Sequence, residues 1–328
     1  MRPIHARRPA ALAAAITLAL AACGSDDALA PDEWESPAAQ SVAAADGQTP
    51  IGALTATPRI IFGSYRIGAH LDLYRMDPGG NNVVRLTSYS GDESYPAVSW
   101  DHKRIAFLRR RVDANNVERD DIYLMNVDGT GKRWARSAPA TFAITRPSWS
   151  PDGKQLVVTA IMQGVELLAT LDLATGALSL VTGWNAPMQG HDGSFSPDGK
   201  SIIFVDPTGR IVQQVFPGGD DANLVNLNLP VGHPTFAPDG KSFAYERLVA
   251  GTTNTEVFVQ NIATKATKRL TYSSSYDGWP TWSPDGTKIA FMSRRSGQYQ
   301  IWTVSAAGGT ATRITHTSTA EVGPSWSH

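Results

Sequence analysis

Short runs of apolar residues, each bounded by polar turn residues, recur along the chain from residue 59 to its end. The clearest runs lie at 105–107, 156–158, 202–204, 243–245 and 289–291. Apolar runs of this length predict β-strands, and their near-continuous apolar character favours strands that are covered on both faces. Such strands are typical of sheets that stack against one another.

Each run follows the same turn, which identifies an internal repeat. The turn is Ser-Pro-Asp-Gly or Ala-Pro-Asp-Gly, and an aromatic residue precedes it at Trp149, Phe195, Phe236 and Trp282. Proline fixes φ at the second position of a type I turn, and glycine closes the fourth. A diverged copy lies at 96–103 and a truncated copy at 324–328. The copies are about 41 to 51 residues apart, which is the period of propeller blades.

Two further apolar segments complete each repeat. One follows the run after the turn, for example at 122–125 and 301–304, and the last ends as Arg-Leu-Thr or a close variant at 85–87, 269–271 and 313–315. Four short antiparallel strands make one blade. The first apolar segment, at 59–62, matches the second strand of a blade, so we expect residues 324–327 to supply the missing first strand. The sequence thus predicts an all-β, six-bladed β-propeller, closed by the C-terminal strand joining the N-terminal blade.

The unit Trp-Ser-Pro-Asp-Gly-x-x-Ile-Ala-Phe resembles the WD-like propeller repeat of the TolB family, over essentially all of residues 59–328. In that family an N-terminal α/β domain precedes the propeller, which binds peptidoglycan-associated lipoprotein. The residues before position 58 leave no room for that domain, so we do not expect the Tol-system role to carry over. Oligogalacturonate lyases and the propellers of some serine peptidases have the same repeat, so the resemblance implies the fold more strongly than a function.

The N-terminus has the pattern of an export signal. Arg2, Arg7 and Arg8 precede an apolar run at 10–20, which is too short to span a bilayer. The run ends in Leu-Ala-Ala-Cys23, which resembles the lipobox of bacterial lipoproteins. The resemblance implies a signal peptide at 1–22 and lipidation of Cys23; a plain export signal is the alternative.

The domain organisation follows from this signal. Residues 23–57, rich in Ala, Ser, Pro, Asp and Gly, are predicted to be a flexible linker, and residues 58–328 the propeller. The expected location is the cell envelope, on the periplasmic side, with the lipid as the membrane attachment. Gly24, which follows the cysteine, favours the outer membrane over the inner.

Charge and cysteine content exclude several classes of function. Removal of residues 1–22 takes away three arginines and no acidic residue, which changes the net charge from −1 to −4. A nucleic-acid-binding protein needs a clustered basic excess, so no nucleic-acid partner is expected. Cys23 is the only cysteine, which rules out an intramolecular disulfide and a cysteine-based zinc site.

No catalytic motif is present in the sequence. It lacks the Gly-x-Ser-x-Gly elbow, the His-Glu-x-x-His motif, the P-loop and the dinucleotide fingerprint, so we predict no catalytic residue and no cofactor. The repeated aspartates Asp152, Asp198, Asp239 and Asp285 each lie in a tight turn. We therefore interpret them as turn residues rather than as metal ligands or catalytic carboxylates.

The loops that lead into the first strand of each blade differ from one another and surround one mouth of the central channel. The loops between second and third strands open on the same face and add arginines at 109–111, 294 and 295. Aromatic and arginine side chains around a concave mouth are typical of a binding surface; the alternative is that each packs against the next blade. The predicted binding face consists of Tyr95, Arg146, His191, His233, Tyr276, Trp279 and Arg294.

The predicted function is that of a non-catalytic cell-envelope lipoprotein whose loop face binds a protein or glycan partner. The enzyme alternative is a metal-dependent polysaccharide lyase, because the related oligogalacturonate lyases use a histidine-rich manganese site in their propeller. His191 and His233, with Gln189 and Asp192 nearby, are the candidate ligands, but His70, His102 and His316 are not placed to complete the set. A structural spacer without a ligand is the third hypothesis.

Overall fold

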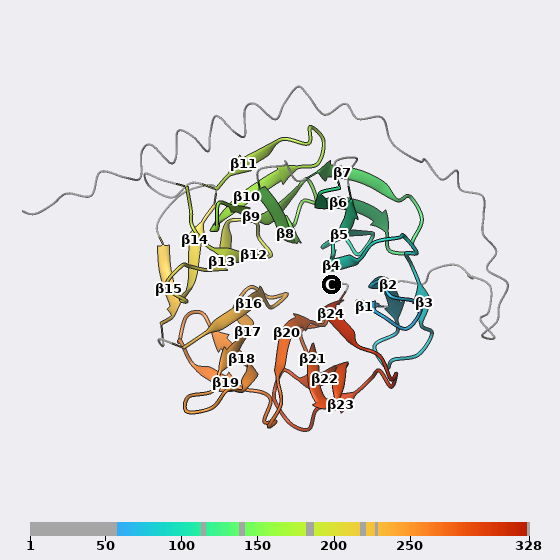
Figure 1. Ribbon diagram of the computed structural model, residues 1–328. Helices are drawn as coiled ribbons and strands as arrows, with labels where there is room; N and C mark the ends of the chain where they lie inside the picture. The colour runs from blue at the N-terminus through green and yellow to red at the C-terminus, as the bar shows by residue number, and fades with distance from the viewer. Residues whose placement is uncertain are drawn as a thin grey trace, which may run out of the picture. The chain divides into compact units, whose positions relative to one another are not determined.

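The computed structural model describes residues 58–112, 116–137, 142–181, 187–216, 221–226 and 229–326. The predicted signal peptide, Cys23 and the linker lie outside the described residues. Over the described ranges the chain is all-β and forms six four-stranded antiparallel sheets arranged as blades around a ring (Figure 1). Within these ranges, no helix has the length and apolar character needed to cross a membrane.

We number the blades from the N-terminal strand. Blade 1 consists of β24 (Glu321–Trp326), β1 (Ile60–Ser64), β2 (Asp72–Met76) and β3 (Val84–Arg85). Blade 2 consists of β4 (Glu93–Val98), β5 (Arg104–Val112), β6 (Glu118–Asn126) and β7 (Arg133–Ser137). Blade 3 consists of β8 (Phe142–Trp149), β9 (Gln155–Met162), β10 (Val165–Asp172) and β11 (Leu178–Leu180).

The second half of the ring repeats this order. Blade 4 consists of β12 (His191–Phe195), β13 (Ser201–Val205), β14 (Ile211–Val215) and β15 (Asp221–Val225). Blade 5 consists of β16 (Val231–Phe236), β17 (Ser242–Leu248), β18 (Thr255–Asn261) and β19 (Thr267–Arg269). Blade 6 consists of β20 (Asp277–Trp282), β21 (Lys288–Ser296), β22 (Gln298–Ser305) and β23 (Thr312–Arg313). The strands β24, β4, β8, β12, β16 and β20 are innermost and face the channel (Figure 1).

The ring closes where its two ends meet in blade 1. Strand β24 pairs antiparallel with β1, so that Ile60 lies opposite Trp326 and Ser64 opposite Glu321. In Figure 1 the red C-terminal strand lies beside the blue N-terminal one. This pairing gives β1 a neighbour on both sides and removes an exposed edge. The predicted six-bladed, all-β fold and its closure are confirmed.

The aromatic residue of the repeat joins neighbouring blades. The indole Nε1 of Trp149 in blade 3 donates to the carbonyl oxygen of Ala97 in blade 2 at 2.9 Å. Trp282 in blade 6 makes the equivalent hydrogen bond to the carbonyl of Thr235 in blade 5 at 3.1 Å. Both indoles are buried. The aromatic position therefore fills the space between two sheets and, at Trp149 and Trp282, also satisfies a main-chain carbonyl there.

The Ser-Pro-Asp-Gly segment forms the turn that the sequence predicts. In blade 3 the hydroxyl of Ser150 donates to Asp152 at 2.7 Å, and the N–H of Gly153 donates to the carbonyl of Ser150. The same serine–aspartate bond occurs at Ser196, Ser283 and Ser99 of the diverged copy. The serine hydroxyl lowers the pKa of Asp152 from its ordinary value. The repeated aspartates therefore stabilise turns.

The Arg-Leu-Thr segment caps the third strand of a blade. The hydroxyl of Thr87 accepts the N–H of Leu73, and Thr271 and Thr315 accept the equivalent N–H groups in blades 5 and 6, at 2.8 to 3.0 Å. In blades 1 and 5 the arginine of the segment also reaches a buried carboxylate on the third strand: Arg85 lies 2.8 Å from Asp72, and Arg269 lies 3.0 Å from Glu256. Threonine and arginine of this segment thus satisfy polar groups that the short fourth strand leaves unpaired.

Candidate functional site

Each innermost strand contains a bulge at the same step, and the bulge places one residue in left-handed backbone. The pairing with the second strand shifts register there in all six blades. The residues with positive φ are Tyr95 (52°), Arg146 (54°), Asp192 (58°), His233 (48°), Trp279 (56°) and Gly323 (57°). These six residues, one per blade, form what we call the mouth ring.

The two residues after each mouth-ring residue line the channel. The first is proline in five blades and Gly193 in blade 4; the second is small or bears a hydroxyl. Together with the mouth ring they enclose a cavity of about 160 Å³ that all six blades line. The second channel positions are Ala97, Ser148, Ser194, Thr235, Thr281 and Ser325.

In three successive blades the bulge N–H is capped by a side chain of the preceding blade. The N–H of Asp192 donates to the hydroxyl of Thr159 at 3.3 Å. The N–H of His233 donates to Asp192 at 3.0 Å, and the N–H of Trp279 donates to Glu246 at 2.9 Å. A bulge removes an N–H from the strand ladder, so these side chains supply the missing acceptor. The polar side chains of the mouth are therefore fixed by the backbone of the neighbouring blade.

Asp192 is the centre of a charged cluster on blades 3 to 5. Its side chain is 4% exposed, and Arg146 Nε lies 2.9 Å from one carboxylate oxygen. His191 Nδ1 lies 3.1 Å and His233 Nε2 3.9 Å from the other oxygen. Burial alone would raise the pKa of Asp192, but His233, His191 and Arg146 together hold that pKa well below its ordinary value.

A second carboxylate, Glu246 on β17, lies on the other side of His233. Glu246 Oε2 is 3.2 Å from His233 Nδ1 and accepts a hydrogen bond from the hydroxyl of Tyr276 at 2.8 Å. Burial lowers the pKa of His233, but Asp192 and Glu246 outweigh it, so the pKa is raised above its ordinary value. Burial and the neighbouring Glu246 raise the pKa of Tyr276. His233 is thus held between two carboxylates, both of which favour its protonated form.

A row of aromatic rings extends from the charged cluster at His233. The rings of His233 and Trp279 lie 4.0 Å apart between centroids, and the rings of Trp279 and Tyr95 lie 5.4 Å apart. All three side chains are half-buried and all three line the cavity. The mouth therefore presents a stacked aromatic surface beside a set of charged side chains that ion pairs hold in place. Side chains that are already ordered lower the entropic cost of binding.

The structure brings together six of the seven residues of the predicted binding face. Tyr95, Arg146, His233 and Trp279 belong to the mouth ring, and His191 lies next to it. Tyr276 contacts this group through Glu246. Arg294 is exposed and lies in a separate lateral pocket. The sequence prediction named Asp192 only as a neighbour of the two histidines, and it missed two further carboxylates, Glu246 and Glu166, the second of which faces His191 Nε2 at 3.7 Å.

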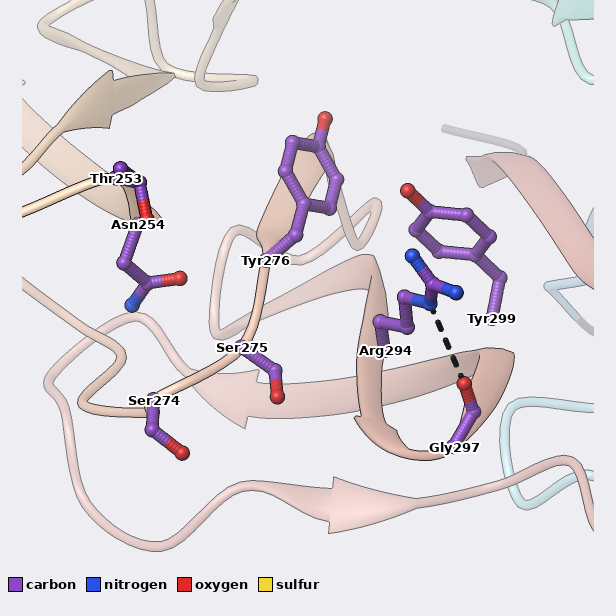
Figure 2. A pocket seen from close by; sticks show the side chains of 8 residues that line it. All are labelled: Thr253, Asn254, Ser274, Ser275, Tyr276, Arg294, Gly297 and Tyr299. Carbon is purple, nitrogen blue, oxygen red and sulfur yellow. Dashed lines mark hydrogen bonds between the residues drawn. The ribbon is translucent and has the colours of Figure 1, made fainter.

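The lateral pocket lies between blades 5 and 6 and has a volume of about 480 Å³. Figure 2 shows polar side chains facing it from three segments. Two of the segments precede β18 and β20, and the third is the hairpin made by the end of β21 and the start of β22. The lining residues are Thr253, Asn254, Ser274, Ser275, Tyr276, Arg294, Gly297 and Tyr299.

The prediction that the arginines at 109–111 lie in a loop is wrong. Arg109, Arg110 and Arg111 lie within β5. Arg110 pairs with Asp120 at 3.0 Å, and Arg111 pairs with Asp121. The guanidinium of Arg109 stacks 3.9 Å above the ring of Tyr89. The apolar run continues into these residues as one long strand, so the arginines stabilise blade 2 itself.

His191 and His233 face the carboxylates that they pair with. Both imidazoles approach Asp192 Oδ2, and Arg146 occupies the space beside the other oxygen. Across the described ranges, no group of three or more His, Cys, Asp or Glu side chains has an arrangement suited to a metal ion.

Comparison with known proteins identifies the propeller. A family model described as the TolB β-propeller domain matches residues 208–328. The Tol-Pal system protein TolB of Francisella tularensis is 29% identical over 185 residues, which cover 53% of this chain and 41% of that protein. The crystal structure of TolB from Acinetobacter baumannii has a TM-score of 0.70 at 25% identity, and covers 82% of this chain and 66% of that one. The propeller is of the TolB type.

A second relative and a second structure are also similar to this TolB-type propeller. An uncharacterized protein of Agrobacterium fabrum is 33% identical over 204 residues, covering 60% of this chain and 66% of that protein. The chain thus spans just under two thirds of that relative and about two fifths of the Francisella protein. A manganese-bound oligogalacturonate lyase has a TM-score of 0.54 at 15% identity, covering 79% of this chain and 74% of that one, which shows a shared fold alone.

Proposed function

We propose that this protein is a non-catalytic interaction scaffold of the cell envelope, and that the mouth ring docks a segment of a protein partner. The observation that supports this proposal is the choice of residues in the ring. Five blades place Tyr95, Arg146, Asp192, His233 and Trp279 in left-handed backbone.

Left-handed backbone costs a non-glycine residue on the order of 1–2 kcal/mol, and glycine avoids this cost. Blade 1 has Gly323 at the equivalent position, so the fold itself accepts glycine there. Non-glycine residues at the other five positions therefore lower the stability of the fold, and the backbone geometry alone does not account for their presence. Strain of this kind is typical of binding and catalytic sites, and two aromatic rings beside a buried charge pair are the material of protein-interaction hot spots.

The relatives favour a protein as the partner. The Francisella relative is named a protein of the Tol-Pal system, and by its name it belongs to a system with further components. We propose a protein partner for this chain, located on the periplasmic side of the envelope. The small channel cavity of about 160 Å³ accommodates one inserted side chain rather than a folded element, which points to an extended segment or a loop.

The test is affinity capture from crosslinked cell envelopes, followed by binding measurements with the purified partner. The site variant combines Arg146→Ala, His233→Ala and Trp279→Ala. The control variant combines Lys154→Ala, Lys200→Ala and Lys241→Ala, three exposed turn residues at the other end of the innermost strands. We expect the partner to lose at least about tenfold in affinity with the site variant only. Equal binding by both variants, with circular dichroism showing both folded, would overturn the proposal.

We propose that Cys23 carries the membrane anchor. Support comes from the Leu-Ala-Ala-Cys segment at the end of an apolar run, and attachment through more than one acyl chain is stable. The test is metabolic labelling with a fatty-acid analogue and membrane fractionation. Wild type should be labelled and sediment with the outer membrane, whereas Cys23→Ser should be unlabelled and soluble in the periplasm. A labelled Cys23→Ser protein would contradict the proposal.

The lyase alternative predicts a bound transition metal, which elemental analysis of the purified protein measures directly. No described contact favours it, because His191 and His233 are both engaged with Asp192. A stoichiometric metal together with unsaturated product from pectic oligomers would replace the scaffold proposal with a catalytic one.

A further inference from the structure

The lateral pocket between blades 5 and 6 differs from the channel mouth in chemistry. All of its side chains are polar or aromatic: four end in a hydroxyl or an amide, two are tyrosines and one is an arginine. Figure 2 shows Asn254 and Thr253 on one side, Ser274 and Ser275 below, and Arg294 with Tyr299 on the other. A volume of about 480 Å³ is within the range of small-molecule sites.

Arg294 supplies positive charge to this pocket. The residue is exposed, its Nε makes one long hydrogen bond of 3.4 Å to the carbonyl of Gly297, and its guanidinium lies 5.8 Å from the centroid of the Tyr299 ring. No ion pair joins Arg294 to any carboxylate of the described residues.

The acidic groups nearest the pocket are already matched with cations. Glu246 lies 3.2 Å from His233. Glu256, next to Asn254 along the chain, pairs with Arg269 at 3.0 Å. Asp277 pairs with Arg295. These carboxylates therefore do not neutralise the positive charge of Arg294. A guanidinium that faces an open pocket favours a ligand with a carboxylate.

The aromatic wall of the pocket is held in place from the channel mouth. The hydroxyl of Tyr276 points away from the pocket to Glu246 Oε2 at 2.8 Å, which leaves the ring as the pocket wall. The ring of Tyr299 meets it edge to face, with centroids 5.9 Å apart at 86°. A fixed aromatic face packs against the C–H face of a pyranose ring, and the surrounding serine and threonine hydroxyls match its hydroxyl groups. The amide nitrogen of Asn254 is already engaged, because it donates to Glu256 Oε1 at 2.8 Å and to the carbonyl of Ser273.

We propose that this pocket binds an acidic sugar, with the ligand carboxylate on Arg294 and the sugar ring against Tyr299. The proposal goes beyond the scaffold function, because it assigns a second site with a different ligand class. It explains why a face that would dock a protein through its central mouth also has a polar, open pocket at its side. The neutral hydroxyl groups of the lining favour a sugar as the ligand, and the single guanidinium without an ion pair favours a ligand that carries an acidic group.

The test measures binding of three probes to the purified protein by saturation-transfer NMR and calorimetry. The probes are galacturonic acid, its neutral counterpart galactose, and acetate. The variants are Arg294→Gln and Tyr299→Ala, with Arg133→Gln as the matched control. Arg133 is an exposed arginine on β7, in blade 2. Single sugars bind weakly, so the expected Kd for galacturonic acid is about 1 mM.

We expect galacturonic acid to bind wild type and the control equally and Arg294→Gln at least about tenfold more weakly. Galactose and acetate should each bind at least about tenfold more weakly than galacturonic acid. Galactose at equal affinity would overturn the assignment of an acid, and acetate at equal affinity would overturn that of a sugar. Absence of saturation transfer from galacturonic acid at about 10 mM would overturn the site itself. None of these outcomes depends on the partner at the channel mouth, which the Trp279 variant tests separately.

Discussion

The imidazole of His233 lies on the indole of Trp279, with ring centroids 4.0 Å apart and an angle of 32° between the planes. The two residues occupy the same position in blades 5 and 6, and Glu246 contacts both of them. Its carboxylate lies 3.2 Å from His233 Nδ1 and accepts the main-chain N–H of Trp279 at 2.9 Å. One buried carboxylate therefore contacts both residues of the stack, accepts the N–H of a bulge and joins two blades.

Replacement of Glu246 should destabilise the propeller strongly. In Glu246→Ala the N–H of Trp279 and the hydroxyl of Tyr276 lose their acceptor and His233 loses a counter-charge. Loss of one partner of a buried pair costs about 3–5 kcal/mol. Glu246→Gln keeps an acceptor oxygen and should cost less than half as much. Chemical denaturation of the two variants measures the difference, and equal stability of Glu246→Ala and wild type would show that the cluster makes no net contribution.

The same cluster predicts a pH dependence of stability. The pKa of His233 is raised in the folded state by Asp192 and Glu246, against the effects of burial and of Arg146. The protonated form therefore stabilises the fold below the unfolded pKa of about 6.5, and this contribution is lost as the pH rises through the folded pKa. We expect the melting temperature of wild type to fall between pH 6 and pH 9 more steeply than that of His233→Gln. Parallel curves for the two proteins would contradict the assignment.

A buried carboxyl without an ion pair should respond to pH in blade 2. Glu93 is fully buried, and burial raises its pKa to about 8, with Asp72 adding to the effect. A raised carboxyl pKa means that stability falls as the pH rises from about 4.5 towards 8. Glu93→Gln should therefore stabilise the protein at pH 8, by at most about 4 kcal/mol, and have little effect at pH 4.5. Asp277→Asn is the comparison variant, because Asp277 occupies the equivalent position, where burial raises its pKa to about 6 while Ser293 and Arg295 offset part of the effect.

If Asp277→Asn stabilised the protein at pH 8 as much as Glu93→Gln does, the ion pair with Arg295 would not be what separates the two positions. The measurement is thermal melting of wild type and both variants across pH 4.5 to 8. We expect Asp277→Asn to give the smaller gain, since the pKa of Asp277 is raised less in the folded state and the guanidinium of Arg295 loses its counter-charge.

The sequence contains enough local information to predict the fold. Each Ser-Pro-Asp-Gly turn is stabilised by residues of the turn itself. The hydrogen bond that Ser150 donates to Asp152, for example, joins residues that are two positions apart in the sequence. The ring closure was also predictable, because the first segment at 59–62 has the pattern of a second strand. What the sequence did not show is the donation from Trp149 to Ala97, which depends on how closely two sheets approach.

The residues of the mouth ring could be predicted from the sequence where a proline follows them. Tyr95, Arg146, His233 and Trp279 all directly precede a proline, so a single alignment of the repeats selects them. In blade 4 glycine replaces that proline, and the prediction selected His191 instead of its neighbour Asp192, which occupies the ring. Glu246 and Glu166 come from other strands of neighbouring blades. Their approach is a property of blade packing and leaves no signal in a single repeat.

The indole hydrogen bonds between blades lead to a graded prediction. Phe195 and Phe236 occupy the position of Trp282 in blades 4 and 5, so the fold accepts a smaller ring there. Trp282→Phe should cost about 1–3 kcal/mol, because the buried carbonyl of Thr235 loses its donor. Trp282→Ala should cost about 3–5 kcal/mol, because a cavity forms as well. Denaturant titration orders the variants, and a cost for Trp282→Phe equal to that for Trp282→Ala would show that volume has no separate effect.

Closure by β24 makes the final prediction. Removal of residues 318–328 leaves β1 without its inner neighbour, and takes away the hydroxyl of Ser325 that accepts the N–H of Val98 in blade 2. Buried side chains of β1, Ile60 and Phe62 among them, would face solvent along an unpaired edge. The truncated protein should lose its cooperative melting transition and aggregate. A synthetic peptide of residues 318–328 should restore both solubility and the transition, whereas a peptide of the same composition in scrambled order should not. A truncated protein that melts cooperatively within a few degrees of wild type would show that the ring does not need this strand.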